Sequence, residues 1–303
     1  MTNIDADQTE SQAGQPSNVQ ILEALKGSGY LFEHEVATAI SDLGYHVETS
    51  WAFMDSEEQK SREIDVRAIR EFYRDDAAKT QVFSELLIEC KDAASPFVFL
   101  QREKNKRELN PDPREYTFPH NTFNVPVGTN SHTTVAAFQL LGLSNRHYYY
   151  RERLKATQFA KIVRKGGNWQ ANHDGVYDAL ILPLAKAVQK SRSTYAAYGG
   201  RDTWATIWLR FPIVVLRDHL FAYDLSEDVP QLQKSNRVSF LRHIESDALK
   251  GHFLTDFVTQ AGLKHFINEE IFGFVDGLVE LARSNRELLV AKDWSGPKYE
   301  FDR

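Results

Sequence analysis

The sequence predicts an α/β fold in which a mixed central sheet is flanked by helices. Near the N-terminus, one amphipathic helical pattern precedes three strand-like segments that short polar turns separate. Turns of this length suit antiparallel hairpins better than crossover connections. Further along the chain, helical patterns are interspersed with apolar strand-like segments, which is the pattern expected where helices cover a sheet.

The first helix is indicated by apolar residues that recur every three or four positions. These residues are Phe32, Val36, Ala39, Ile40 and Leu43. Such spacing gives a helix one apolar face, and the following Gly44 is a natural end.

Three strands are expected next, at 45–53, 62–73 and 82–92. The first two are rich in aromatic and β-branched residues or alternate apolar with polar ones. The third has an apolar run, Leu86 to Ile88, typical of a buried strand. Polar turns at 54–61 and 74–80 join the three strands.

The remainder of the chain is predicted more coarsely. Residues 101–134 contain four prolines and are expected to form a long loop or several short pieces. Helices are expected at about 133–141, 150–165 and 175–192, and strands at 203–211, 212–218 and 220–225. A β-pair at 238–246 and 252–259 and a final amphipathic helix over 262–286 complete the pattern.

The chain is expected to form one α/β domain over residues 18–303, because no linker-like change in composition divides it. Residues 1–17 are polar and aperiodic, so they are expected to be a disordered tail. No run of 18 apolar residues is present, and the N-terminus has no apolar signal-peptide core. These features predict a cytoplasmic protein with no membrane partner.

Composition excludes several functional classes. The 303 residues carry a net charge of −6, which disfavours a coat-like, non-specific nucleic-acid binder but leaves room for a local basic groove. A single cysteine, Cys90, rules out an intrachain disulfide and a cysteine-rich zinc site. The ten histidines form no metal-binding pair, and no phosphate-binding glycine loop occurs.

The main candidate site combines Asp65 with Glu89 and Lys91. Successive strand residues point to opposite faces, so Glu89 and Lys91 share a face while Cys90 points toward the core. If the second and third strands are hairpin neighbours, Asp65 and Glu89 converge on one point. Two such carboxylates need a positive charge between them, and Mg²⁺ or Mn²⁺ prefers oxygen ligands. Lys91 could then orient or help deprotonate a water that attacks a phosphodiester.

This arrangement resembles the PD-(D/E)XK nuclease superfamily, which has the restriction-endonuclease-like fold. The similar segments are the helix GSGYLFEHEVATAISDLGYHV, the strand SREIDVRAI and the strand ELLIECKD. The first is similar to the opening of Mrr-like prokaryotic nucleases. The resemblance implies that Asp65 and Glu89 bind the metal, that Lys91 is the catalytic lysine and that the Cys90 backbone carbonyl is a further ligand. It covers about residues 18–100, the expected catalytic core, which 133–303 would complete. Ile64 stands where the motif's name expects proline.

A glutamate of the first helix is implied as a further catalytic and metal-binding residue. At about 100° per residue, Glu33 and Glu35 flank the apolar face on opposite sides, so the helical wheel does not choose between them. The family pattern, in which the glutamate follows an aromatic residue, favours Glu33.

A basic segment after residue 145 is the candidate nucleic-acid surface, because cations neutralise phosphates and tyrosines can stack on bases. Its candidate residues are Arg146, Tyr149, Arg151, Arg153, Lys155, Lys161, Arg164 and Lys165. The alternative is a solvated helix face with tyrosines packed inward.

The sequence therefore predicts a metal-dependent nuclease that hydrolyses DNA, with RNA as an open alternative and a role in prokaryotic restriction or defence implied by the resemblance. A catalytically inactive nuclease-fold protein that binds nucleic acid or a partner protein is the second hypothesis. A structural or regulatory subunit of a larger complex is the third. By analogy with double-strand cutters of this fold, a homodimer is expected.

Overall fold

The computed structural model describes residues 15–92, 94–109, 113–127, 131–173, 175–195 and 203–296. Residues 1–14 of the expected tail lie outside these ranges. The helices are α1 (Asn18–Ser28), α2 (Tyr30–Ser41), α3 (Ala137–Leu140), α4 (Tyr148–Arg151), α5 (Val176–Thr194), α6 (Gln260–His265), α7 (Phe272–Ser284) and α8 (Arg286–Val290). Short 3-10 segments span Lys106–Leu109 (η1) and Leu143–Asn145 (η2), and a π-helical turn, Phe266–Ile271 (η3), joins α6 to α7.

The strands lie between His46 and Thr259. They are β1 (His46–Met54), β2 (Ser61–Asp75), β3 (Thr80–Lys91), β4 (Phe97–Glu103), β5 (Tyr116–Thr117), β6 (Thr122–Val127), β7 (Ser131–Ala136), β8 (Leu154–Lys165), β9 (Asn168–Asn172), β10 (Ala205–Leu216), β11 (Leu220–Asp224), β12 (Leu232–Lys234), β13 (Arg237–Glu245) and β14 (Lys250–Thr259).

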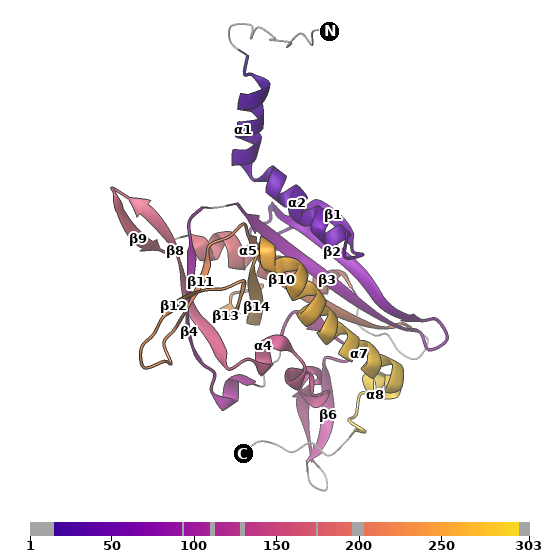
Figure 1. The fold of residues 1–303 in the computed structure, drawn as a ribbon. Helices are drawn as coiled ribbons and strands as arrows, with labels where there is room; N and C mark the ends of the chain where they lie inside the picture. The colour runs from indigo at the N-terminus through magenta and orange to yellow at the C-terminus, as the bar shows by residue number, and fades with distance from the viewer. Residues whose placement is uncertain are drawn as a thin grey trace, which may run out of the picture.

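The larger sheet has the order β1-β2-β3-β10-β14-β13, with β5 paired to β10. The first three strands are antiparallel neighbours, as the short turns predict, whereas β3, β10 and β14 run parallel. The sheet is therefore mixed, and helices flank it (Figure 1). The predicted coarse class, α/β with a mixed sheet and flanking helices, is confirmed.

A second sheet has the order β12-β11-β4-β8-β9. Two adjacent strands of the larger sheet lead into it, because β3 continues as β4 and β10 continues as β11. At this corner the Phe97 amide donates to the His219 carbonyl at 2.8 Å, and the Arg217 amide donates to the Lys91 carbonyl at 3.3 Å. The C-terminal end of β3 is thereby fixed where the two sheets meet.

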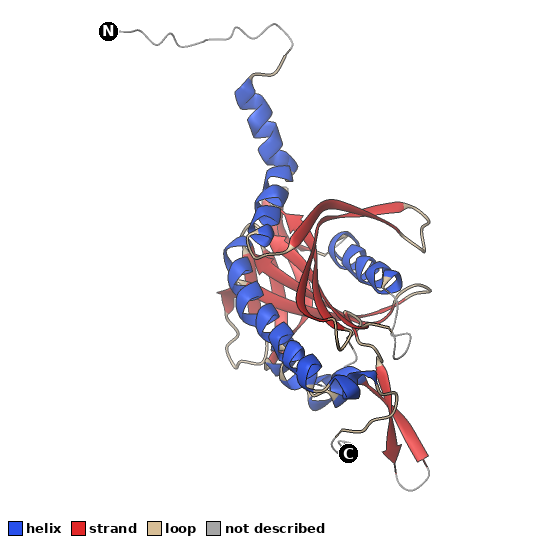
Figure 2. Ribbon diagram, turned by 90° about the vertical axis from the view of Figure 1, so that its right-hand side faces the viewer, coloured by secondary structure: helices blue, strands red, loops and turns tan. Residues whose placement is uncertain are grey.

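Helices cover both faces of the larger sheet. On one face, α2 and α7 contribute Phe32, Ile40 and Leu278 to the larger buried cluster. On the other face, α5 lies within the curve of the sheet (Figure 2) and contributes Leu184 and Val188 to a second cluster that also contains aromatic residues of β4. Helix α1 projects from the body and has no buried residue.

A buried charged network fastens α5 to the sheet. Glu85 on β3 is fully buried, accepts a hydrogen bond from Arg67 Nε at 2.7 Å, and also accepts one from the Ser191 hydroxyl of α5. Arg210 of β10 is fully buried too, and its Nε lies 3.2 Å from Glu85 Oε2. Charges are tolerated at such depth only when they are paired and hydrogen-bonded.

Several predicted elements are confirmed, while others are wrong. The helix expected at 150–165 is strand β8 after the single turn α4, and most of 133–141 belongs to β7 and the short α3. The segments 203–211 and 212–218 form one strand, β10, in spite of Pro212. Proline is tolerated there because β5 pairs with β10 at 208–209 and β14 begins to pair at 213, so Pro212 falls between the two ladders.

Candidate active site

The candidate site lies where β2 and β3 separate. Their ladder starts at the pair Val66–Ile88, so Asp65 lies just past its end. Asp65 also falls at a break in the ladder to β1, opposite Ser50, which has a left-handed φ of 53°. The Asp65 side chain bridges the gap, because its Oδ2 accepts the backbone N–H of Cys90 at 2.6 Å.

The two polar residues of the third strand lie on one face, as the alternation predicts. Lys91 Nζ is 3.0 Å from Glu89 Oε2. The Glu89 side chain is 8% exposed and the Lys91 side chain 33% exposed. Between them, Cys90 belongs to the buried cluster under α2, which confirms its prediction as a core residue. The apolar strand therefore delivers one buried acid and one accessible amine to the same corner.

Helix α2 brings Glu33 to this corner. A cleft of about 270 Å³ is lined by Gly27, Ser28, Gly29, Glu33, Asp65, Cys90, Lys91 and Asp92. Gly29 separates α1 from α2 with a φ of +86°, so the chain can turn sharply beside the cleft. Glu35 points elsewhere, since its Oε2 accepts hydrogen bonds from Arg217 Nη1 at 2.8 Å and from the side-chain Nε2 of Gln260 at 2.9 Å. The ambiguity of the helical wheel is thus resolved in position: Glu33, not Glu35, lines the cleft.

The three carboxyls have raised pKa values. Burial, together with the Asp65 charge, raises the pKa of Glu89 to about 7, against the lowering effect of Lys91. Burial also raises the pKa of Asp65, which the Cys90 amide partly offsets. The pKa of Glu33 is raised by burial and then by Asp65. Each acid therefore lacks sufficient positive charge around it.

Lys91 has the opposite balance. Burial disfavours its charged form, yet the neighbouring Glu89 and Asp65 raise the pKa of its ammonium group. It is therefore protonated at neutral pH, and it is suited to donate hydrogen bonds and positive charge rather than to accept a proton.

The donor set has the chemistry of a Mg²⁺ or Mn²⁺ site but is not a formed coordination shell. Carboxylate oxygens and a backbone carbonyl are the ligands that these hard cations take, and Glu33, Asp65, Glu89 and Cys90 would supply them. Across the ranges that the structure describes, however, no three His, Cys, Asp or Glu side chains are grouped so that they could hold an ion as they stand. Binding would have to draw the carboxylates together.

The predicted nucleic-acid residues are divided among different environments. Tyr149 is 1% exposed, so its ring is not accessible to a base. Ion pairs with acidic residues occupy Arg151 (Glu270), Arg153 (Glu103, Asp224 and Glu227) and Lys155 (Glu108). Arg146 donates to the Gly277 carbonyl. Lys161, Arg164 and Lys165 lie on β8, and the last two are exposed near its end.

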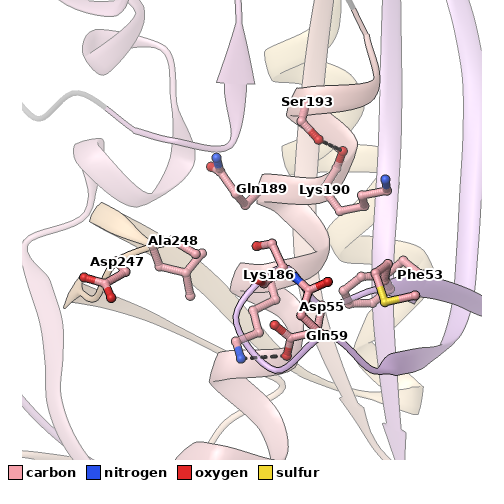
Figure 3. A pocket seen from close by; sticks show the side chains of 12 residues that line it. Phe53, Asp55, Gln59, Lys186, Gln189, Lys190, Ser193, Asp247 and Ala248 are labelled. Atoms are coloured by element: carbon pink, nitrogen blue, oxygen red, sulfur yellow. Dashed lines mark hydrogen bonds and ion pairs between the residues drawn. The ribbon is translucent and has the colours of Figure 1, made fainter.

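A larger cleft, of about 500 Å³, lies between α5 and the turn after β1 (Figure 3). Its conspicuous charge is Lys186, whose Nζ lies 2.7 Å from Asp55 and 3.1 Å from Glu57. Hydrogen bonds from Lys186 and Arg62 lower the Asp55 pKa in spite of burial. This cluster satisfies its own charges and fastens the β1–β2 turn to α5.

Sequence reasoning missed one pair beside the cleft. Arg217 Nη2 lies 2.9 Å from Asp92 Oδ2, and Arg217 also binds Glu35. The pair ties the residue after Lys91 to α2 through the end of β10. Nothing in the sequence near Asp92 indicates a partner 125 positions away.

No helix within the described ranges is long and apolar enough to cross a membrane. Comparisons with family models, with curated proteins and with solved structures give no match to this chain.

Proposed function

We propose that this protein is a metal-dependent nuclease of the PD-(D/E)XK type, with a restriction-endonuclease-like fold, that hydrolyses phosphodiester bonds of DNA at the cleft. The observation that carries the proposal is the meeting of Asp65, Glu89 and Lys91 at the point where β2 and β3 separate. Glu33 of α2 lines the cleft together with Asp65 and Lys91, and Glu89 is paired with Lys91.

The chain's own residues have distinct tasks in this reaction. Glu33, Asp65 and Glu89 would hold Mg²⁺ or Mn²⁺, and the ion would neutralise the negative charge that develops on the phosphate. Lys91, kept protonated by its acidic neighbours, donates hydrogen bonds to the attacking water or to a phosphate oxygen. The oxygen of water forms the new bond to phosphorus as the bond to the leaving sugar oxygen breaks. The leaving oxygen takes up the proton that water releases, directly or through solvent.

The test is cleavage of plasmid and of single-stranded DNA with Mg²⁺ or Mn²⁺, compared with Asp65→Ala and Lys91→Ala. Each variant is expected to lose activity by about 100-fold or more, because each removes charge that is aligned with the transition state. A matched control is Asp76→Ala, which alters an exposed carboxylate at the β2–β3 turn, at the other end of both strands. Equal cleavage by wild type and both site variants would remove the assigned site.

A catalytically inactive protein of the same fold, which binds nucleic acid or a partner protein, is the second candidate. The Glu89–Lys91 ion pair and the lack of a three-ligand cluster among the described residues favour it. Titration calorimetry with Mn²⁺ separates the two proposals: no heat of binding, together with retained DNA binding on a gel, would support the inactive protein.

A further inference from the structure

A two-stranded ribbon, formed by β8 and β9, projects from the second sheet. The β8–β9 ladder runs from the pair Lys161–Asn172 to the pair Lys165–Asn168 at the turn. Strand β4 pairs with β8 only as far as Lys161, so residues 162–171 continue beyond β4 as a hairpin (Figure 1). At about 3.4 Å per residue, the ribbon extends roughly 15 Å from its base.

The ribbon is basic in an otherwise acidic protein. From 154 to 173 the sequence contains no Asp or Glu but has Lys155, Lys161, Arg164 and Lys165. Lys155 lies before the ribbon, on the part of β8 that pairs with β4, and is neutralised by Glu108. For the other three, no carboxylate partner is found among the described residues, and the Arg164 guanidinium contacts only the nearby Gly167 carbonyl, at 3.4 Å. The charge of the ribbon thus remains available to an anion.

Both faces of the ribbon carry polar groups. Residues directly opposite each other in an antiparallel pair share a face. One face carries Arg164 and Trp169, which is 67% exposed. The other face carries two cations and three side-chain amides: Lys161, Lys165, Asn168, Gln170 and Asn172. A ribbon that is exposed over residues 164–171 and polar on both faces is suited to being surrounded by its ligand.

A short stretch of chain connects Lys91 to the base of the ribbon. The Ile162 amide donates to the Pro96 carbonyl at 2.8 Å. Pro96 follows Lys91 by five residues, which span at most about 18 Å. That distance equals about five base pairs of B-DNA, at 3.4 Å each. One duplex could therefore contact the cleft and the ribbon together.

We propose that the β8–β9 ribbon enters the major groove of duplex DNA and holds it against the cleft, an inference that rests on the proposed nuclease function. The major groove is about 12 Å wide and admits a two-stranded β-ribbon. Lys161, Arg164 and Lys165 contact the flanking phosphates, while Asn168 and Gln170 reach the base edges. The substrate is accordingly double-stranded DNA. A strand held by stacking would need several exposed rings, whereas the ribbon presents Trp169 as its one aromatic side chain.

The experiment measures binding without cleavage, in EDTA, by fluorescence anisotropy of a 20-base-pair duplex over a series of salt concentrations. The double variant Arg164→Ala/Lys165→Ala is expected to weaken binding about tenfold. It should also reduce the slope of log K against log salt by about 2, because each lost phosphate contact contributes about 0.9. The matched control, Arg74→Ala/Arg283→Ala, removes two arginines near the β2–β3 turn, remote from Lys91, and should leave both quantities unchanged.

Two further measurements test whether binding needs an open major groove and whether the protein prefers duplex to single-stranded DNA. In one duplex, the cytosines carry a bulky 5-glucosyloxymethyl group that fills the major groove. The wild-type protein should bind this duplex about tenfold more weakly than the unmodified one. A single strand of the same length should bind more weakly than the duplex. Tighter binding to the single strand, equal binding to the blocked duplex, or an unaltered salt slope in the ribbon variant would each overturn the inference.

The outcomes also separate this inference from the nuclease proposal. If duplex binding depends on the ribbon but no metal-dependent cleavage is found, the role of the ribbon stands and the nuclease proposal is rejected. If the wild-type protein cleaves DNA but the ribbon variant binds duplex as tightly as wild type, the nuclease proposal stands and the role of the ribbon is rejected.

Discussion

The carboxylate of Asp65 accepts the backbone amide of Cys90 across the gap where β2 and β3 separate, at 2.6 Å. The contact orients Asp65 toward the end of β3, next to Glu89 and Lys91. It also supplies an acceptor for an amide beyond the last ladder pair, so the same carboxylate has a structural and a proposed catalytic role.

Replacing Asp65 by Asn and by Ala separates those roles. Asn keeps a carbonyl oxygen for the Cys90 amide but loses the charge, so Asp65→Asn should fold with a melting temperature close to that of wild type. Ala leaves the amide without its acceptor and should cost about 1–3 kcal/mol of unfolding free energy. Both variants should lose Mn²⁺ binding and cleavage, measured by calorimetry and plasmid nicking. Retained Mn²⁺ affinity in Asp65→Asn would contradict a ligand role.

The two glutamates of α2 make a second matched pair. Glu33 lines the cleft, whereas Glu35 is paired with Arg217. Glu33→Gln should weaken Mn²⁺ binding about tenfold or more and slow cleavage. Glu35→Gln should leave both within twofold and lower the unfolding free energy by no more than about 1 kcal/mol, as expected for a partly exposed ion pair. The reverse pattern would transfer the ligand role to Glu35.

Stability should fall as the pH rises through the titration range of Glu89. Its folded pKa is raised from 4.5 to about 7, so between these values the folded protein holds a proton that the unfolded chain has lost. The unfolding free energy of wild type, relative to Glu89→Gln, should therefore decrease by up to about 3 kcal/mol from pH 4.5 to 8. Urea denaturation at several pH values measures this difference.

Mn²⁺ provides the control for that titration. A bound cation favours the charged carboxylate. At pH 8, Mn²⁺ should therefore raise the unfolding free energy of the wild-type protein but not that of the Glu89→Gln variant. Replacing the exposed Glu245 by Gln should leave the wild-type pH profile in place. Parallel pH profiles for wild type and Glu89→Gln would show that the Glu89 carboxyl is solvated like an ordinary one.

The arrangement of the site was predictable because it is encoded locally. Alternation within one strand places Glu89 and Lys91 on a common face, and a short turn makes β2 and β3 neighbours, which brings Asp65 to them. The choice between Glu33 and Glu35 was not predictable from the helical wheel. The position of Glu35 depends on Arg217, which follows β10 and forms ion pairs with Glu35 and Asp92.

The second sheet could not be predicted, because the residue pattern of its strand β8 also fits a helix. Strand β8 is half-buried along most of its length, and its basic residues occur at spacings that a helix face also gives. Its strand state is set by β4 on one side and β9 on the other, which are tertiary pairings. The predicted nucleic-acid residues consequently fall on a ribbon and on a paired surface rather than on one helix face.

The buried network of Glu85 should dominate the stability of the larger sheet. Glu85 faces two guanidinium groups, those of Arg67 and Arg210, and α5 reaches the same carboxylate through Ser191. Burial lowers the Arg210 pKa to about 10, so this group stays charged at neutral pH. Removing the carboxylate takes away the Arg210 ion pair seen among the described residues, while Arg67 keeps its ion pair with Glu48.

Glu85→Ala should therefore lower the unfolding free energy by about 3–5 kcal/mol, as is typical when one partner of a buried ion pair is lost. Glu85→Gln, which keeps an acceptor oxygen, should cost less. Glu71→Ala is the control, because this glutamate is exposed on β2, and it should change the unfolding free energy by less than about 0.5 kcal/mol. Urea denaturation at pH 7 provides the measurement. Equal costs for Glu85→Ala and Glu71→Ala would mean that the two arginines find other partners or water, and that α5 is held by its apolar face alone.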